Sequence, residues 1–319
     1  MKNELLIIGP DAEKHGLGGV TVHVSRLRNC LEKHHVDYTF KDYKTTNLRS
    51  LINEIKKSHV VHLHVSNPIY QFVLVACSRM MGHNVVMTLH GNYGRFGWIK
   101  NMFVKYAVKF ASVPIVINND SYERCLEFNR QTKLIPAFIP PQMKEELQKE
   151  IIELMNRLHG EGRIIVSTNA SAVAWDKQGR EIYGVDFLVR FFKEDYRRVL
   201  VVSDPSGNYR KRYASLQSNS VFFIGYPHSY YELLKYVDYF VRNTSTDGDA
   251  LSVKEALSLG VPTLCTDVVD RPEGVSLFKY CDEHSFETAL SSNLIVSTHY
   301  NDGVKSLLDI YKSFKISVR

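Results

Sequence analysis

Apolar strand-like runs alternate with helix-like segments along almost the whole chain, and this alternation strongly limits the folds available to it. The run at 84–90, for example, is apolar on both faces, as is typical of a parallel sheet covered by helices on both sides. Repeated β-α units of this length predict a doubly wound α/β fold. Strands are predicted at 5–9, 36–42, 60–65, 84–90, 113–118, 133–136, 163–168, 199–203, 221–225 and 238–242.

A break in the alternation divides these units into two series. The prolines at 140 and 141 lead into a charged stretch, 144–157, and the strand pattern restarts at residue 163. We therefore predict two Rossmann-like domains, 1–142 and 143–300, with the carboxyl ends of both sheets facing a cleft. The final segment, 301–319, is predicted to contain an amphipathic helix.

Composition indicates a soluble globular protein. The 319 residues suffice for two domains, and the hydrophobic and charged fractions, 44% and 23%, are ordinary. No apolar run approaches the ~20 residues that span a bilayer, and the apolar N-terminal run lacks a signal-peptide cleavage pattern. The five cysteines are widely spaced, which predicts free thiols in a reducing cytoplasm.

Positive charge is concentrated in the first half. Residues 1–160 hold 21 of the 40 basic residues but only 14 of the 34 acidic ones. This balance favours an anionic partner, namely acidic lipid, a lipid diphosphate or nucleic acid, although an ordinary solvated surface also fits. The segment 94–111 mixes aromatic residues with lysines, as in a helix on an anionic membrane surface. A core helix with a solvated lysine face is the simpler alternative. Because no nucleic-acid-binding pattern accompanies it, we expect no nucleic-acid partner.

The segment 243–267 consists of a loop of small and polar residues, a predicted helix and a short apolar strand. Asp247 precedes the helix, and Glu255 follows eight residues later, in its first turns. The loop can present backbone N–H groups to an anion such as phosphate at the helix N-terminus. Glu255 can accept paired hydrogen bonds from a sugar diol. Ordinary helix capping is the alternative for both acids.

This unit resembles the acidic-x7-acidic nucleotide-sugar motif of retaining GT-B glycosyltransferases of the group-1 or family-4 type. The glutamate is followed by Ala-Leu-Ser-Leu-Gly-Val-Pro and by a strand that ends at Asp267, as in that family. The resemblance implies the GT-B fold and retaining transfer from a nucleoside-diphosphate sugar to a glycan or lipid-linked acceptor. It also implies bacterial surface polysaccharide or glycolipid synthesis, at the inner face of the membrane. In such proteins the last helix often returns to the first domain.

The resemblance also assigns roles to individual residues. Glu255 is expected to bind the nucleoside ribose, Asp247 the hydroxyls of the donor sugar, and His90 the donor sugar from the first domain. Backbone groups are expected to stabilise the diphosphate, and these belong to Gly248, Asp249, Ala250, Leu251 and Ser252. The loop with Gly18 and Gly19 resembles the family loop that faces the diphosphate and the acceptor.

Two histidines, His62 and His64, point to one face of their predicted strand, because side chains alternate along a strand. Such a pair can bind a metal ion, but the sequence offers no evident third ligand. The resemblance requires no metal for the chemistry, so neither a metal site nor a cofactor is predicted. Packing or acceptor contact is the expected role of the pair.

The chain also departs from the family pattern. Tyr183 stands where the family has a lysine that binds the donor diphosphate, and we expect Lys177 or Arg180 to substitute. Asp247 replaces the usual glutamate, and Ala250 stands where glycine is common. Arg271 follows the last predicted strand and is either an anion contact or an exposed structural arginine.

Two other functions fit the same sequence. A catalytically degenerate nucleotide-sugar-binding module, acting with a partner subunit, would explain the missing lysine. A sugar-nucleotide epimerase on the same fold would convert the donor without an acceptor, but its acid/base residues are not evident.

Overall fold

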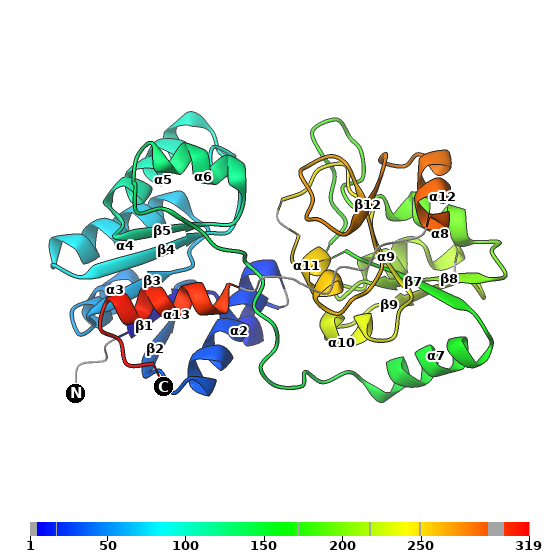
Figure 1. Cartoon of the computed structure of the whole chain (residues 1–319), viewed down its shortest axis with the longest axis horizontal. Coiled ribbons are helices and arrows are strands. Elements are labelled where there is room, and N and C mark those ends of the chain that lie inside the picture. The colour runs from blue at the N-terminus through cyan, green and yellow to red at the C-terminus, as the bar shows by residue number, and fades with distance from the viewer. Residues whose placement is uncertain are drawn as a thin grey trace. The chain divides into compact units, whose positions relative to one another are not determined.

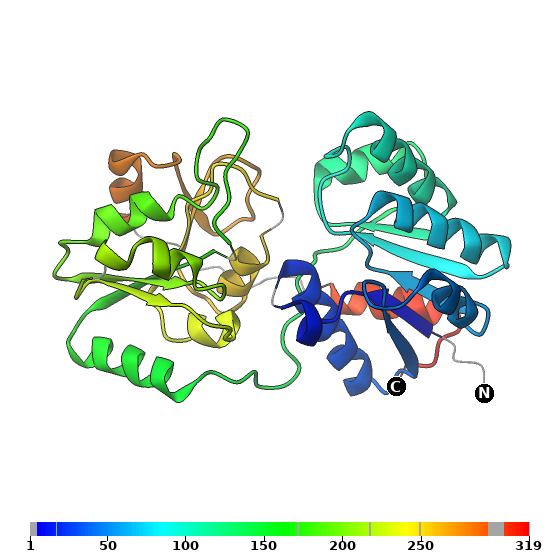
Figure 2. The same cartoon turned by 180° about the vertical axis from the view of Figure 1, so that it is seen from behind.

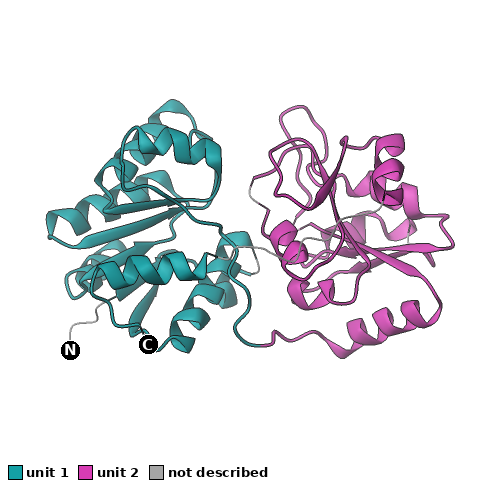
Figure 3. Ribbon diagram, in the orientation of Figure 1, with its two compact units in different colours: residues 1–143, 301–319 teal, residues 144–300 magenta. Residues whose placement is uncertain are grey.

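The computed structural model describes residues 5–16, 18–170, 172–216, 218–248, 250–292 and 303–318. The chain divides into two compact units (Figure 3). Unit 1 comprises Met1–Met143 together with Asn301–Arg319, and unit 2 comprises Lys144–Tyr300. Each unit is a parallel sheet of six strands with helices on both faces, and each is described by itself below.

The sheet of unit 1 has the strand order β2-β1-β3-β4-β5-β6, and all of its neighbouring strands are parallel. The chain order reverses beside β1, which pairs with β2 on one side and β3 on the other. In open α/β sheets, ligands bind outside the carboxyl strand ends at such a point. The strands are β1 Leu5–Gly9, β2 Tyr38–Asp42, β3 Val60–Leu63, β4 Asn84–Leu89, β5 Val113–Val116 and β6 Lys133–Leu134.

Helices form two layers around this sheet, because alternate strand residues point to opposite faces. Leu6 and Ile8 pack with α3, α4, α5 and α6, whereas Leu5 and Ile7 pack with α2 and α13. In Figure 1, α5 lies above strands β4 and β5, and α13 lies below these two strands. The helices are α1 Ala12–His15, α2 Gly19–Lys33, α3 Leu48–Ile55, α4 Pro68–Met80, α5 Trp98–Phe110, α6 Asn119–Leu126 and α13 Val304–Ser313.

The C-terminal helix α13 is an integral part of the core of unit 1. Leu307 and Tyr311 are buried against strands β1 and β3 and helix α2. The hydroxyl of Tyr311 lies 2.6 Å from Nδ1 of His62, which is itself fully buried in β3. Residues from both ends of the sequence therefore share one hydrophobic core.

Unit 2 repeats the architecture with the strand order β12-β11-β10-β7-β8-β9 (Figure 2). Its strands are β7 Ile164–Asn169, β8 Arg198–Ser203, β9 Val221–Ile224, β10 Tyr239–Arg242, β11 Thr263–Thr266 and β12 Val275–Phe278. Its helices are α7 Lys149–Gly160, α8 Val185–Phe192, α9 Asn208–Arg212, α10 Tyr230–Leu234, α11 Leu251–Ser258 and α12 Glu283–Ser291, with a 3-10 turn at Ala214–Leu216. Phe192 and Phe286 anchor one face of the sheet, and Met155 of α7 packs on the other.

The predicted doubly wound α/β class is confirmed, with one strand missed. The strand β12 follows a segment containing proline and glycine, and only Phe278 of its four residues is buried. An edge strand of this kind lacks the apolar run that identified the other strands. The described residues do not include 293–302 and 319, which belong to the predicted ranges 143–300 and 301–319.

Candidate functional site

A loop in unit 2, Asn243–Gly248, connects the end of β10 to α11 and is fixed by its neighbours. The side-chain amide of Asn243 donates to the carbonyl of Gly184 at 2.9 Å, and the Ser245 N–H donates to the carbonyl of Ile182 at 2.9 Å. Gly184 has φ +51°, and a Cβ there would lie 2.3 Å from the Asn243 amide. Only glycine suits both the conformation and the contact. The loop that carries the predicted acid is therefore held in one position.

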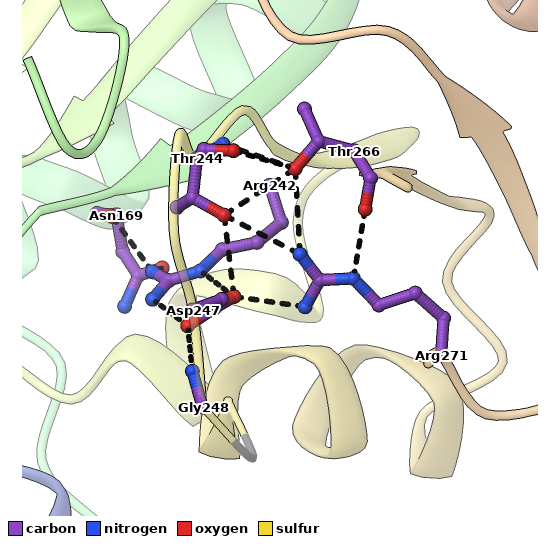
Figure 4. Close-up of polar contacts among 7 residues, drawn as sticks. All are labelled: Asn169, Arg242, Thr244, Asp247, Gly248, Thr266 and Arg271. Atoms are coloured by element: carbon purple, nitrogen blue, oxygen red, sulfur yellow. Dashed lines mark hydrogen bonds and ion pairs between the residues drawn. The ribbon is translucent and has the colours of Figure 1, made fainter. Parts of the chain in front are cut away.

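The carboxylate of Asp247 is buried between two arginines (Figure 4). Its Oδ1 accepts from Nη2 of Arg242 at 3.0 Å, and its Oδ2 accepts from Nε of Arg242 at 3.1 Å and Nη1 of Arg271 at 2.8 Å. Burial opposes ionisation of this carboxyl group, but the two guanidinium charges outweigh it and lower its pKa to about 2. Asp247 is thus a permanent anion, with both oxygens engaged by the protein.

Arg271 is a buried member of this network, with only 3% of its side chain exposed. Besides Asp247, its guanidinium donates to the carbonyl of Thr266 at 3.0 Å and to the hydroxyls of Thr244 and Thr266 at 3.3 and 3.4 Å. The alternative of an exposed structural arginine is therefore wrong. Arg271 anchors the segment after β11 to the loop after β10.

Arg242 is the site residue that sequence reasoning missed. It ends β10 and donates from Nη1 to the carbonyl and side-chain oxygens of Asn169, at 3.4 and 3.3 Å. Its guanidinium carbon also lies 5.1 Å from the ring centroid of Tyr183. A charged residue at the carboxyl end of a buried strand was the available signal, because side chains there reach the ligand-binding edge of a parallel sheet.

Lys177 and Arg180 belong to a hairpin in unit 2 that contacts the loop through Ser245. Trp175 and Glu181 form its antiparallel bridge, and Arg180 donates to the carboxylate of Asp176 at 2.8 Å. Lys177 is exposed at the tip. The cations that contact the Asp247 carboxylate are Arg242 and Arg271, and diphosphate binding by Lys177 or Arg180 stays a prediction.

Glu255 lies within α11 and is 4% exposed. Burial raises the pKa of the Tyr230 phenol in α10, and the negative charge of Glu255 adds to this effect, which places the carboxylate near that ring. The helix begins at Leu251 after the N-cap residue Ala250, which provides no side-chain cap. Ala250 thus offers no side-chain acceptor to the first N–H groups of the helix, and such groups favour an anion. Asp249 lies outside the described residues.

Unit 1 brings together three histidines that are far apart in sequence. His23 comes from α2, while His64 and His90 directly follow β3 and β4. Nδ1 of His64 lies 2.9 Å from Nε2 of His90, and one ring nitrogen from each of the three lies within 4.8 Å of the others. The sequence offered no evident third ligand for the pair His62 and His64, and the structure groups His64 with His23 and His90. His62 instead contacts Tyr311 and the hydroxyl of Thr88.

The glycines of the first loop lie at the start of α2. Gly18 is the N-cap residue, and its N–H donates to the hydroxyl of Thr21 at 2.8 Å, while Gly19 is the first residue of the helix. A Cβ at Gly19 would meet nothing within 4 Å, so packing does not require glycine there. The N-terminal part of α2 therefore has open space beside it.

No protein-family model and no curated protein sequence matches the chain. Solved structures do. HepE from Anabaena, in complex with UDP and glucose, aligns with a TM-score of 0.70 at 13% identity, over 98% of this chain and 99% of HepE. An α,α-trehalose-phosphate synthase from Burkholderia xenovorans, in complex with glucose-6-phosphate, aligns with a TM-score of 0.65 at 10% identity, over 98% of this chain and all (100%) of the synthase.

The fold is GT-B. The UDP-GlcNAc 2-epimerase of Methanocaldococcus jannaschii also shares it, with a TM-score of 0.64 at 11% identity over 97% of this chain and 99% of the epimerase. The same GT-B architecture thus occurs in transferases and in an epimerase. At such identities the likeness shows the fold, and the chemistry has to be argued from the side chains of this chain.

One surface of the GT-B chain in unit 1 is unusually apolar. Helix α5 buries Val104, Ala107 and Val108, yet it also exposes apolar residues on its other side. Trp98 is 73% exposed and Phe110 45% exposed, and Ile99, Met102 and Tyr106 lie between them. We call these five residues the α5 surface. None of the helices described is both long enough and apolar enough to span a bilayer.

Proposed function

We propose that this chain is a retaining glycosyltransferase of the family-4 type that moves a sugar from a nucleoside-diphosphate sugar to an acceptor hydroxyl. The observation that carries the proposal is the arrangement around Asp247 and α11 in unit 2. A fixed loop, two arginines and the start of a helix lie at the carboxyl edge of a parallel sheet, with the buried Glu255 in the same helix. HepE, which has the same fold, binds UDP and glucose.

Sugar transfer places negative charge on the departing diphosphate. As the bond between the sugar C1 and the diphosphate oxygen breaks, the departing diphosphate gains negative charge, which guanidinium and backbone N–H groups stabilise. In a retaining reaction the acceptor oxygen bonds to C1 on the face that the diphosphate leaves. A departing phosphate oxygen is then close enough to take the acceptor proton. This scheme uses no side-chain nucleophile and no metal ion.

The buried Glu255 suits a second task, because a carboxylate can accept two hydrogen bonds from the ribose diol. Glu255 is thus assigned to the nucleoside and the start of α11 to the diphosphate. The roles of His90, Gly18 and Gly19 stay predictions from the resemblance. Bacterial surface polysaccharide or glycolipid synthesis in the cytoplasm is the setting that we propose for the reaction.

Nucleotide sugars should stabilise the protein against heat. At 100 times its dissociation constant a donor adds about 2.7 kcal/mol to the free energy of unfolding. For a unit of this size that corresponds to a rise in the melting temperature of roughly 5–10 °C. Thermal melting with UDP-, GDP-, ADP- and dTDP-sugars, with and without a metal chelator, measures the effect. A selective shift that survives the chelator is expected, and no shift with any of the four would contradict the proposal.

Two other functions remain to be separated from transfer. The epimerase neighbour favours conversion of the donor alone, and the tyrosine at 183 favours a binding module without turnover. Incubating the selected donor with and without candidate glycan acceptors distinguishes all three. Transfer requires both substrates, epimerisation requires only the donor, and a binding module leaves the donor unchanged.

We further propose that unit 1 contacts an anionic membrane through the α5 surface, where a lipid-linked acceptor would be found. The exposed aromatic rings can enter the headgroup region, while Lys105 and Lys109, both exposed on the same helix, can contact acidic lipid. The rings of Tyr106 and Phe110 stack with centroids 6.2 Å apart, which makes the surface continuous. The basic balance of residues 1–160 supports the same partner.

The two tryptophans of the chain offer a matched test of this contact. Trp98→Ser should weaken co-sedimentation with vesicles containing one-third phosphatidylglycerol by about tenfold, since it removes an apolar group worth roughly 1.5–3 kcal/mol when buried. Trp175→Ser, at the half-exposed tryptophan of unit 2, should have no effect. High salt should also weaken binding. Equal binding of both variants, or binding as strong to neutral vesicles, would rule out the α5 surface.

A further inference from the structure

Two guanidinium groups share one buried carboxylate at the carboxyl ends of β10 and β11. Arg242 and Arg271 both contact Asp247, so these three side chains carry a net charge of +1. The carboxylate cannot neutralise both cations, and it cannot be protonated at physiological pH because its pKa is about 2. A net positive charge on three largely buried side chains favours the binding of an anion beside them.

The two arginines differ in how fully the protein uses them. Arg271 donates from Nε, Nη1 and Nη2 to acceptors on Thr266, Asp247 and Thr244, and it is almost completely buried. Arg242 donates from Nε and Nη2 to Asp247, and its Nη1 contacts Asn169 at 3.3 and 3.4 Å, as long as the contacts that Nη2 of Arg271 makes to the threonine hydroxyls. The side chain of Arg242 is also 11% exposed. Arg242 is therefore the more accessible of the two cations to an incoming oxyanion.

The orientation of Arg242 is set on two sides. Asp247 holds its Nε and Nη2 edge through two hydrogen bonds, at 3.1 and 3.0 Å. The ring of Tyr183 lies 5.1 Å from the guanidinium carbon, a distance at which an aromatic ring attracts a cation. The group is thus pre-positioned before any ligand arrives, with its Nη1 side as the part available for binding.

We propose that Arg242 is the phosphate-binding cation of unit 2 and that Asp247 and Tyr183 are positioning residues that orient it. The ligand class is a nucleoside diphosphate, whose oxyanions match the planar fork of a guanidinium group. This inference rests on the proposed function. It gives Asp247 a role different from contact with donor hydroxyls, and it explains how the chain manages with a tyrosine at 183, since the cation comes from β10 instead.

Calorimetric titration with UDP and with uridine separates phosphate binding from nucleoside binding. If the wild type prefers GDP, ADP or dTDP, the titrations use that nucleotide and its nucleoside in place of UDP and uridine. Arg242→Gln should weaken UDP binding by roughly 10- to 100-fold, the loss expected for charge-assisted hydrogen bonds, and should leave uridine binding within about twofold. Adding Tyr183→Lys to this variant returns a cation beside the site and should recover at least about threefold of the loss.

Arg198→Gln is the matched control. Arg198 is the first residue of β8 and so lies at the amino-terminal ends of the strands of the same sheet. Its guanidinium group donates hydrogen bonds to Asp195 and Glu287. This variant loses comparable ion pairs and should still bind UDP within about twofold of the wild type. If Arg242→Gln does not fold, the variant Arg242→Gln/Asp247→Asn, which also removes the carboxylate charge, takes its place.

The possible results separate the role of Arg242 from the proposed function on which that role rests. A wild type that binds none of the four nucleoside diphosphates overturns the proposed function and this inference together. A wild type that binds UDP, with a folded Arg242→Gln variant that binds it equally well, overturns the inference alone. Equal losses for UDP and uridine would also overturn it, because they would show a general disturbance of unit 2 and not a lost phosphate contact.

Discussion

Glu255→Ala is expected to lower kcat/KM for sugar transfer by roughly 100- to 1000-fold. The carboxylate is assigned two hydrogen bonds to the ribose diol, and bonds to a charged acceptor contribute about 1.5–3 kcal/mol each. Losing roughly 3–4 kcal/mol of transition-state stabilisation corresponds to that decrease in rate. Steady-state kinetics with the donor selected by thermal melting measures it.

A 2′-deoxyribose form of the donor shows whether the effect comes from the ribose. The wild type should prefer the ribose donor, because the deoxy donor leaves a buried carboxylate oxygen without a partner. Glu255→Ala should lose this preference while keeping its secondary structure. Glu153→Ala, at an exposed glutamate of α7, should behave as the wild type. If Glu255→Ala retained the preference, the carboxylate would not be the ribose ligand.

Lowering the pH from 7.5 to 5.5 should strongly destabilise unit 1. Burial lowers the pKa of His62 to about 3, and the charge of His23 adds to the shift; burial, followed by neighbouring charges, also lowers the pKa values of His64 and His90 well below their ordinary value. These neighbouring charges include Arg95, which acts on His90. In the unfolded chain each of the three histidines titrates near 6.5.

Whether stability rises or falls with pH depends on which state, folded or unfolded, binds more protons. Below about pH 6.5 the unfolded chain takes up protons that the folded unit does not, so stability falls as the pH decreases toward the folded pKa values. Between pH 7.5 and 5.5 each histidine lowers the free energy of unfolding by about 1.4 kcal/mol in total. Asp247, with a pKa of about 2, stays ionised throughout and does not contribute.

Hydrogen exchange of the β3 and β4 amides reports this loss for unit 1 by itself. Protection should fall steeply between pH 6.5 and 5.5, after correction for the pH dependence of intrinsic exchange. His62→Asn should reduce the steepness, whereas His59→Asn, at an exposed histidine just before β3, should not. A pH-independent protection in the wild type would mean that the three rings take up protons in the folded state as readily as in the unfolded chain.

The sheets were predictable because a covered parallel strand requires apolar residues on both faces, and this leaves a clear trace in runs such as Val85–Leu89. The missed strand β12 is an edge strand with partly exposed residues, so the same burial does not constrain its sequence. Apolar runs in the sequence therefore identify covered strands well and edge strands poorly.

The site was harder to predict, because its contacts join residues that are distant in sequence. Lys177 and Arg180 precede Tyr183 in the sequence, and the structure adds that Arg180 is paired with Asp176 in their hairpin. Arg242 was read as the last residue of a strand, since nothing local shows that it bonds the loop after it. The histidine group was missed for the same reason, as α2 brings His23 to His64 and His90, which lie 41 and 67 residues further along the chain.

The position of α13 has a consequence for how the protein is made. The core of unit 1 contains Leu5 and Ile7 as well as Tyr311 and Ile316, so the ribosome must translate nearly every described residue before that core can close. All described residues of unit 2, from 144 to 292, emerge before α13 does. The nascent chain can therefore complete its second unit first, while the first still exposes the apolar face that α13 later covers. A chaperone that binds exposed apolar surface during translation would find its target on the part of the chain that was synthesised earliest.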